Sequence, residues 1–344
     1  MHTLGLLVLG FVFGAALRYA RLNRFDTISG LAMLQDFTVA KAIAVAIGTG
    51  MVLIHLEVAL GWASLHIKPL LLGGVVLGGL VFGVGMAILG YCPGTLAVSV
   101  GEGSLDALAG IVGGLLAGWL FTLLVPVMTP LLGPNLGKPA AATLLGWASV
   151  ALWVLVLVVT GVLWSVAFVL HRLDRQRDAR WLVAGVVLGL LEALVFLKGV
   201  ENRPIGASTA YPYLADLLTG TTGNAYFHKI ARSGAWEAVF LAGALLAGLV
   251  LSLVRREFRW TVVHRRWQET RGADPRSRLL WAFVGGFLLV FGARMAGGCT
   301  SGHILSGGLQ LAVSSWVFMG TVAVGLVATG HWFYRAGRSK TGGV

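Results

Sequence analysis

The feature that most constrains the fold is an internal match between two segments 207 residues apart, each with one of the two cysteines of the chain. Cys92 and Cys299 occupy equivalent places, and seven glycines match at the same spacing. The matched glycines of the first copy are Gly78, Gly79, Gly85, Gly90, Gly101, Gly113 and Gly118. Each cysteine follows a long apolar segment and lies in a glycine-rich break, GYCPGT in one copy and GGCTSGH in the other. The chain therefore consists of two related halves.

The apolar segments are too long and too numerous for the core of a soluble domain. Hydrophobic residues make up 57% of the sequence and charged residues only 12%, and a membrane-spanning helix needs about 20 mainly apolar residues. Nine segments qualify, at residues 4–18, 40–60, 69–89, 105–125, 143–170, 181–197, 235–254, 279–295 and 309–333. We therefore expect an all-α integral membrane protein with about nine transmembrane helices in the lipid bilayer.

The formal net charge of +12 comes largely from arginines that cluster after the first, fifth, seventh and ninth expected spans. The clusters fall within residues 18–24, 172–180, 255–278 and 335–340. If the N-terminus lies outside, all four clusters and the C-terminus are cytoplasmic, as the positive-inside rule requires. The distribution predicts a multi-pass protein of the bacterial cytoplasmic (inner) membrane, and it argues against nucleic acid as a partner.

The two halves are expected to cross the membrane in opposite directions. The cysteine-bearing spans are the third and the eighth, and an odd difference in span number reverses the direction. The pattern predicts two inverted-topology repeats, with a transport pathway at their interface. Residues 1–126 form the first repeat, 127–180 a linker with the fifth span, and 181–344 the second repeat with a cytoplasmic tail.

The breaks beside the cysteines predict short re-entrant half-helices. Pro93 lacks a backbone donor and Gly94 permits non-helical torsions, and irregular backbone in a membrane must be buried in protein or line a wet cavity. Helix starts near these breaks would present free N–H groups, which suit an anion. The expected substrate-binding residues at the two breaks are Cys92, Pro93, Gly94, Thr95, Cys299, Thr300, Ser301 and Gly302.

Two further candidates near the second break each have two interpretations. Arg294, late in the eighth span, either attracts an entering anion or extends to the membrane surface. His303 either contacts the substrate or satisfies the broken backbone. An acidic residue is a candidate carrier of a coupling proton, but the spacing singles out none of Glu102, Asp106, Glu192 and Glu201.

The chemistry of the two thiols favours a sulfur-rich substrate. A thiol is soft and polarizable, and it suits a terminal sulfur better than a hard oxyanion. A disulfide between Cys92 and Cys299 is a minor alternative. The sequence contains no metal-ligand spacing and no phosphate-binding loop, so it indicates neither a metal nor a cofactor.

Two motifs resemble a known family. GARMAGGCTSGHILSG, residues 292–307, closely resembles the signature of the YeeE/YedE family of sulfur-transport membrane proteins, and GVGMAILGYCPGT, residues 83–95, resembles its matching motif. The resemblance covers nearly the whole chain. It implies thiosulfate uptake through an hourglass-shaped protein with re-entrant helices, in which thiols along a narrow path make transient S–H contacts with the ion. By position, Cys92 and Cys299 match two of these thiols.

One departure from the family bears on the substrate. Thiosulfate-importing relatives have a further cysteine after the first span, in a context like RFC, whereas this chain has RFD with Asp26. An ionised carboxylate would repel a dianion at the mouth, which leaves another sulfur species, or a selenium analogue, open as substrate.

Three functions follow from these observations. The first is a permease for a small sulfur-containing anion, foremost thiosulfate, through a midplane constriction lined by Cys92 and Cys299. The second is a membrane sulfurtransferase that passes sulfane sulfur, held as a cysteine persulfide, to a cytoplasmic sulfur-accepting protein. The third and least favoured is a structural subunit, for which neither cysteine would affect substrate passage.

Overall fold

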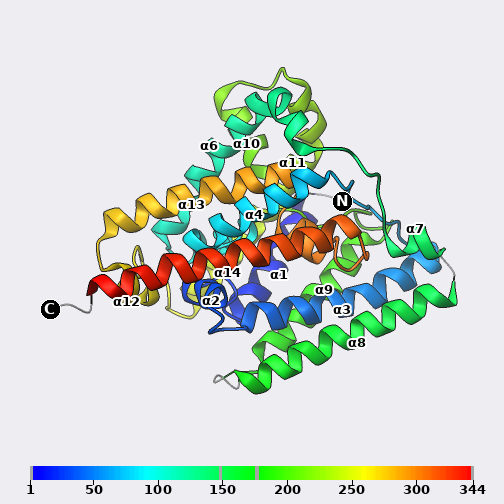
Figure 1. Cartoon of the computed structure of the whole chain (residues 1–344), viewed down its shortest axis with the longest axis horizontal. Helices are drawn as coiled ribbons and strands as arrows, with labels where there is room; N and C mark the ends of the chain where they lie inside the picture. Colours follow the sequence, from blue (N-terminus) through cyan, green and yellow to red (C-terminus); the bar gives the residue numbers. More distant parts are fainter. Residues whose placement is uncertain (1–2, 147–148, 175–177, 342–344) are drawn as a thin grey trace.

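A computed structural model describes residues 3–146, 149–174 and 178–341, with the side chains of residues 335–341 excluded. Within these ranges the chain is all-helical, and its β-pairings are isolated bridges (Figure 1). The elements are α1 (Thr3–Tyr19), α2 (Phe25–Ala32), α3 (Thr38–Ala59), α4 (Leu72–Leu89), α5 (Pro93–Gly101), α6 (Leu105–Met128), η1 (Thr129–Leu132), α7 (Ala141–Leu145), α8 (Val150–Leu173), α9 (Arg180–Phe196), α10 (Ala210–Thr219), α11 (Ala225–Val254), α12 (Arg265–Arg271), α13 (Pro275–Ala296), η2 (Thr300–Leu305) and α14 (Val313–Thr341).

Seven helical stretches are long and apolar enough to cross a membrane, so the chain is a multi-pass membrane protein. They are Thr38–Ala59, Leu72–Gly101, Leu105–Leu132, Val150–Leu173, Ala225–Val254, Pro275–Leu305 and Val313–Tyr334. The other two of the nine expected spans are α1 and α9, which have 17 residues each. At a rise of about 1.5 Å per residue such helices are slightly shorter than a hydrocarbon core of about 30 Å.

The helices pack in matching pairs from the two halves of the sequence. α1 packs along α11 as α9 packs along α3, and α6 packs on α13 as α14 packs on α4. Glycines bring the backbones together, because they have no side chain to separate them. Gly10 lies against the backbone of Phe240, and Gly185 lies against that of Ala42. α4 and α13 cross each other at the centre, where Gly78 lies against Gly292.

Both cysteine segments begin with the same helix ending. α4 ends at Gly90 with a φ of 78°, and α13 ends at Gly297 with a φ of 75°. This left-handed conformation suits glycine. Two residues later, Cys92 caps the nine-residue helix α5 and Cys299 caps the six-residue π-helix η2. The expectation of short helices after the breaks is therefore confirmed, and Ser104 caps the next helix, α6.

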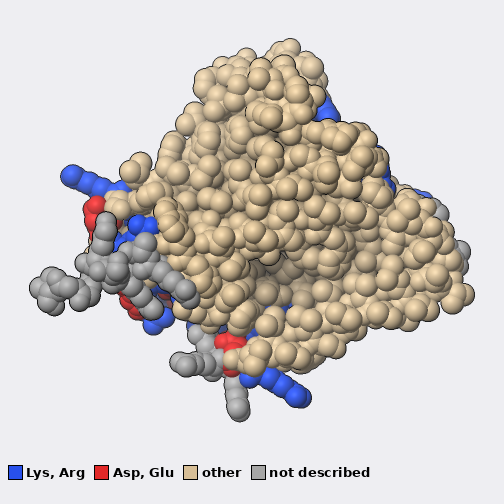
Figure 2. All heavy atoms as spheres, viewed as in Figure 1, with Lys and Arg blue, Asp and Glu red and all other residues tan. Residues whose placement is uncertain are grey.

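Charged side chains are confined to parts of the surface. In Figure 2 the broad middle of the face is tan, and lysines and arginines gather at its left and lower edges. The left edge is where α14 ends beside α12 (Figure 1). We call this end of the bundle, which has the arginines of residues 18–24 and 255–278, the arginine-rich end.

Candidate functional site

A cavity of about 210 Å³ lies beyond the C-terminal end of α13, whose N-terminal end belongs to the arginine-rich end. We call this cavity the vestibule. The charged residues that line it are Lys68, Arg203, Lys229, Arg294 and Glu237. Four cations against one carboxylate give the lining a net positive charge, which attracts small anions and raises their local concentration.

Lys68 connects the vestibule to the loop that holds Cys299. Its Nζ donates a hydrogen bond to the carbonyl of Gly297 at 2.7 Å. The amine also occupies the space that a Cβ would need at Gly298, and it lies close to Gly302. Burial lowers the pKa of Lys68 to about 8. A cation that changes charge near neutral pH therefore lies directly beside the cysteine loop.

Arg294 lies inside the protein, on the wall of the vestibule. Its Nε donates to the Tyr226 hydroxyl at 3.0 Å, and its Nη1 donates to Ser208 at 3.2 Å and to Thr209 at 3.0 Å. All three partners are neutral hydroxyls, so the hydrogen bonds orient the guanidinium without cancelling its charge. Of the two sequence interpretations, extension to the membrane surface does not fit this position.

Glu237, the one carboxylate of the vestibule, acts as a backbone cap. It accepts hydrogen bonds from the main-chain N–H groups of Thr209 at 2.6 Å and Ala210 at 3.3 Å, where α10 begins. The positive end of the helix dipole stabilises a carboxylate at this point. Arg203, in the preceding loop, stacks on Trp236 at 4.2 Å from the ring centre.

Cys299 is a free and fully buried thiol between Gly297 and Gly302, which both line the vestibule. Its Sγ lies 3.2 Å from the Ser301 hydroxyl. His303 is bound at both ring nitrogens, by Ser315 at 3.0 Å and by the carbonyl of Ala296 at 2.9 Å. His303 therefore satisfies the broken backbone, which is one of its two expected roles, and Thr300 is buried beside it.

Cys92 is a free, half-buried thiol at the start of α5. The Thr95 hydroxyl lies 3.4 Å from its Sγ and also accepts from the Cys92 N–H at 2.8 Å. Pro93 offers its carbonyl to the Tyr211 hydroxyl at 3.2 Å. Gly94 faces Phe13 and Ala207 across a space that a Cβ would crowd.

The segment before and at the start of α10 contacts both cysteine motifs. Ile205 lies near Gly302 on one side, and Ala207 lies near Gly94 on the other. At the start of α10, the Tyr211 hydroxyl donates to the carbonyl of Pro93, the residue after Cys92. The site thus brings together the two breaks and this third segment.

Sequence reasoning found the cysteines and the breaks, but it did not single out Lys68, Lys229, Glu237 or Tyr211. Glu237 lies within the apolar segment 235–254, and Tyr211 follows the polar stretch of residues 203–209, and both positions were available signals. Lys68 and Lys229 carried none, because each is one of several basic residues near a span end.

Comparison with known proteins identifies the family. A family model described as sulphur transport matches residues 21–328. The chain belongs to the sulphur transport family. The resemblance to the YeeE/YedE proteins is thereby confirmed. A relative named thiosulfate transporter TsuA, from Spirochaeta thermophila, is 28% identical over 328 residues, which cover 91% of this chain and 93% of that protein.

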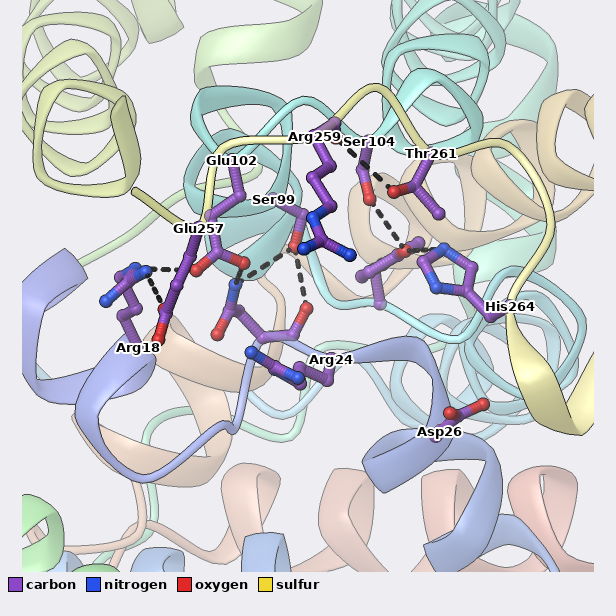
Figure 3. Close-up of a pocket in the computed structure, with 12 residues that line it drawn as sticks. Arg18, Arg24, Asp26, Ser99, Glu102, Ser104, Glu257, Arg259, Thr261 and His264 are labelled. Carbon is purple, nitrogen blue, oxygen red and sulfur yellow. Dashed lines mark hydrogen bonds and ion pairs between the residues drawn. The ribbon is translucent and has the colours of Figure 1, made fainter. Parts of the chain in front are cut away.

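This member of the sulphur transport family has a second polar pocket, of about 230 Å³, at the arginine-rich end (Figure 3). Arg18 binds both Glu102 and Glu257 at 2.6 Å. Asp26 lines the same pocket and accepts from the N–H of Arg266 at 3.0 Å. The carboxylate that replaces the expected cysteine is therefore hydrogen-bonded to the main chain.

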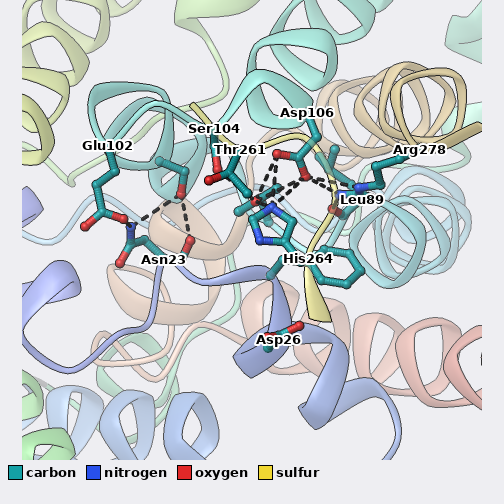
Figure 4. A network of polar contacts seen from close by, with 12 residues as sticks. Asn23, Asp26, Leu89, Glu102, Ser104, Asp106, Thr261, His264 and Arg278 are labelled. Atoms are coloured by element: carbon teal, nitrogen blue, oxygen red, sulfur yellow. Dashed lines mark hydrogen bonds and ion pairs between the residues drawn. The ribbon is translucent and has the colours of Figure 1, made fainter. Parts of the chain in front are cut away.

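Next to this pocket a buried ion pair fastens several helices together (Figure 4). Arg278 and Asp106 are both fully buried and meet at 2.6 Å. Arg278 also donates to the carbonyl of Leu89 at 2.6 Å, near the end of α4. His264 and Tyr91 complete the network around Asp106. A buried pair with its remaining hydrogen bonds satisfied is the arrangement in which burial of charge is tolerated.

Proposed function

We propose that the chain is a permease that takes up a small sulfur-containing anion, with thiosulfate as the first candidate. The observation that carries the proposal is the vestibule, because its cationic lining ends at the loop of Cys299. Membership of the sulphur transport family and the name of the relative agree with this function.

The proposed route runs from the vestibule past Cys299, along Tyr211 to Cys92, and out through the pocket at the arginine-rich end. Lys68 and Arg294 neutralise the anion at its entry, and the soft thiols contact its terminal sulfur. Cys299 is fully buried in this state, so the ion passes only when the loop of residues 297–302 moves. The glycines of that loop permit such a change of torsion.

The paired helix packing supports two inverted-topology repeats, with the cysteine motifs as re-entrant elements at their interface. From the positive-inside rule we infer that the arginine-rich end lies in the cytoplasm and the vestibule outside, in the inner membrane of a bacterium. Uptake of a dianion in this direction opposes an inside-negative potential. The cost is roughly 2.3 kcal/mol per charge for each 100 mV, so the ion needs a coupling partner or a rapid chemical sink.

A sulfurtransferase is the second candidate, and the contact between the Thr95 hydroxyl and Cys92 favours it, because such a donor stabilises a thiolate. The Cys92 thiolate would attack the sulfane sulfur of thiosulfate, form a persulfide and release sulfite. A cytoplasmic sulfur-accepting protein would then take up the sulfur. Mass spectrometry of purified protein after exposure to thiosulfate distinguishes the two functions, because only the second leaves a sulfur adduct on a cysteine.

The test of the permease is uptake of labelled thiosulfate by proteoliposomes that contain the purified protein. We expect uptake that depends on Cys299 and withstands an excess of sulfate. Absence of uptake by folded protein would refute thiosulfate as the substrate, and sulfide and polysulfide would then be tested.

A further inference from the structure

Glu192 is a buried carboxylate that the proposed route does not use. It lies on α9 and is 1% exposed. Its two carboxylate oxygens, Oε1 and Oε2, are 2.9 Å and 2.8 Å from the Ser306 hydroxyl. The backbone of Ile205 is its other polar neighbour. In the described part of the chain, no basic side chain forms an ion pair with Glu192.

Two other buried carboxylates near the site, Asp106 and Glu237, have compensation that Glu192 lacks, whereas the buried Asp216 of α10 has the hydroxyls of Thr122 and Thr221 as partners. Asp106 forms an ion pair with Arg278, and Glu237 caps α10 on the wall of the cationic vestibule. An ionised carboxylate that has neutral hydrogen-bond partners but no cation is costly in a membrane interior, whereas a protonated one is not. The surroundings of Glu192 therefore favour the neutral acid in this state.

Apart from Glu57, the titratable groups on the elements packed around Glu192 contact other partners. They are Arg18 of α1 with Glu102, Lys41 of α3 with Asp174, His55 of α3 with the carbonyl of Met51, His303 of η2 with Ser315, and Arg203 on Trp236. Glu57 lies near the C-terminal end of α3. None of these groups is among those that act on the Glu192 carboxylate.

The other half of the molecule indicates that the fold does not need a carboxylate here. Ser99 lies 207 residues before Ser306 and so is its equivalent. The Ser99 hydroxyl donates to the backbone carbonyl of Asn23 at 2.6 Å, and it lies 3.4 Å from the side-chain amide nitrogen of Asn23. A neutral partner therefore satisfies this serine in the first half, and the acid in the second half calls for a functional reason.

Glu192 is connected to the vestibule through one hydroxyl. The Ser306 hydroxyl lies 3.0 Å from the carbonyl of Ile205, and Ile205 lines the vestibule. The single Ser306 proton can serve either that carbonyl or the carboxylate, but not both. A proton on Glu192 would supply a second donor, so that both acceptors could be satisfied. Ser306 directly follows the last residue of η2, the helix that Cys299 caps.

We propose that Glu192 is a proton-binding site that couples anion uptake to proton entry. The inference rests on the proposed function and names its coupling ion. In each cycle Glu192 takes one proton from water of the vestibule through Ser306. It holds this proton as the neutral acid while the anion passes Cys299, and it releases the proton to the arginine-rich end. One positive charge then accompanies each anion, so the inward charge movement of a dianion is reduced by one.

The test measures two fluxes in the same proteoliposomes, with the membrane potential clamped. Labelled thiosulfate reports the anion, and a pH-sensitive dye in the lumen reports protons. For the unmodified protein we expect thiosulfate to bring protons into the lumen, and acid outside to accelerate thiosulfate entry. At a saturating thiosulfate concentration, where the charge of Lys68 no longer limits binding, Glu192→Gln should still allow downhill thiosulfate entry, without proton entry and without acceleration by acid. Glu192→Asp, which keeps the acid, should retain both.

The matched control is Glu269→Gln, which makes the same chemical change at an exposed carboxylate on α12, and it should behave like the unmodified protein. Thiosulfate entry without proton entry in the unmodified protein would overturn the proposal, whether or not Glu192→Gln folds. Persistent proton entry in folded Glu192→Gln would overturn it too. Failure of the permease itself gives a different result, namely no thiosulfate flux in the unmodified protein.

Discussion

The vestibule and the pocket at the arginine-rich end use the same kinds of residues in different ways. The vestibule has four cations and one carboxylate, and that carboxylate binds main-chain N–H groups. The other pocket has three arginines and three carboxylates, and Arg18 is bound to two of the latter. The excess positive charge of the vestibule attracts an anion. In the other pocket the carboxylates already neutralise the arginines, which therefore hold helices together and bind a passing anion weakly. The difference gives the proposed route a direction.

The largest effect should come from the structural cations. Arg278→Met would leave Asp106 buried without a partner, which typically costs about 3–5 kcal/mol. We expect a lower thermal unfolding temperature and poor recovery of monodisperse protein. The double variant Asp106→Asn/Arg278→Met should recover part of the loss. A stable Arg278→Met protein with altered uptake alone would contradict the structural role of this end.

The next effect concerns the thiols between the two regions. Cys299→Ala should reduce thiosulfate uptake more than about tenfold, a loss of at least about 1.4 kcal/mol in the interaction with the passing ion. Cys92→Ala should do the same, and both variants should remain folded because little volume is removed. Initial uptake rates and size-exclusion profiles test this. Normal uptake by the well-expressed double variant would rule out a role for the thiols.

A smaller effect should distinguish the cations of the two ends. Lys229→Gln removes one charge from the vestibule lining and should raise the KM for uptake about threefold at low ionic strength, less at high salt. Arg265→Gln, on exposed α12 at the arginine-rich end, is the matched control and should leave the KM unchanged. Equal changes in the two variants would mean that overall charge, rather than the vestibule, attracts the anion.

The pH dependence of binding should follow Lys68, whose pKa burial lowers to about 8. Below that pH the amine is charged and attracts the anion, and above it the amine is neutral. The KM should therefore rise as the pH on the vestibule side rises through about 8, with no pH difference across the membrane. Lys68→Arg should abolish this rise because arginine stays charged. A KM that rises equally in both proteins would assign the titration to another group.

The smallest effect should come from Asp26. Its carboxylate accepts from the N–H of Arg266 and adjoins several arginines, and an amide oxygen can accept the same bond. Asp26→Asn should therefore change thiosulfate uptake less than about threefold, since a neutral hydrogen bond replaces the charge-assisted one. A large gain in uptake would instead show that this carboxylate repels the substrate.

Local sequence patterns were sufficient for the helices and for the breaks between them. The apolar runs correspond to helices because backbone groups in a membrane must be satisfied within the helix itself. Gly90 and Gly297 could be recognised as helix ends because the left-handed torsion that ends each helix is local and favours glycine. Cys92 and Cys299 follow at fixed spacing, so their equivalence was also readable.

Partners distant in sequence could not be predicted in the same way. Arg278 was one arginine of a cluster, and only folding places it against Asp106, 172 residues away in sequence. Arg294 had two interpretations until its hydroxyl partners on other segments were known. Lys68 and Lys229 resembled ordinary residues at span ends until the loops around α13 brought them to one cavity.

The sequence by itself determined that this protein lies in a membrane, has two related halves and presents a cysteine at each of two broken helices. These properties depend on composition, periodicity and local torsion, which act over a few residues. Only the tertiary structure decided which charges are paired, which remain free to attract an anion, and that Glu192 is buried beside a serine without a cation. Electrostatic energy depends on distance and burial in space, and both are set by the packing of helices that are far apart along the chain.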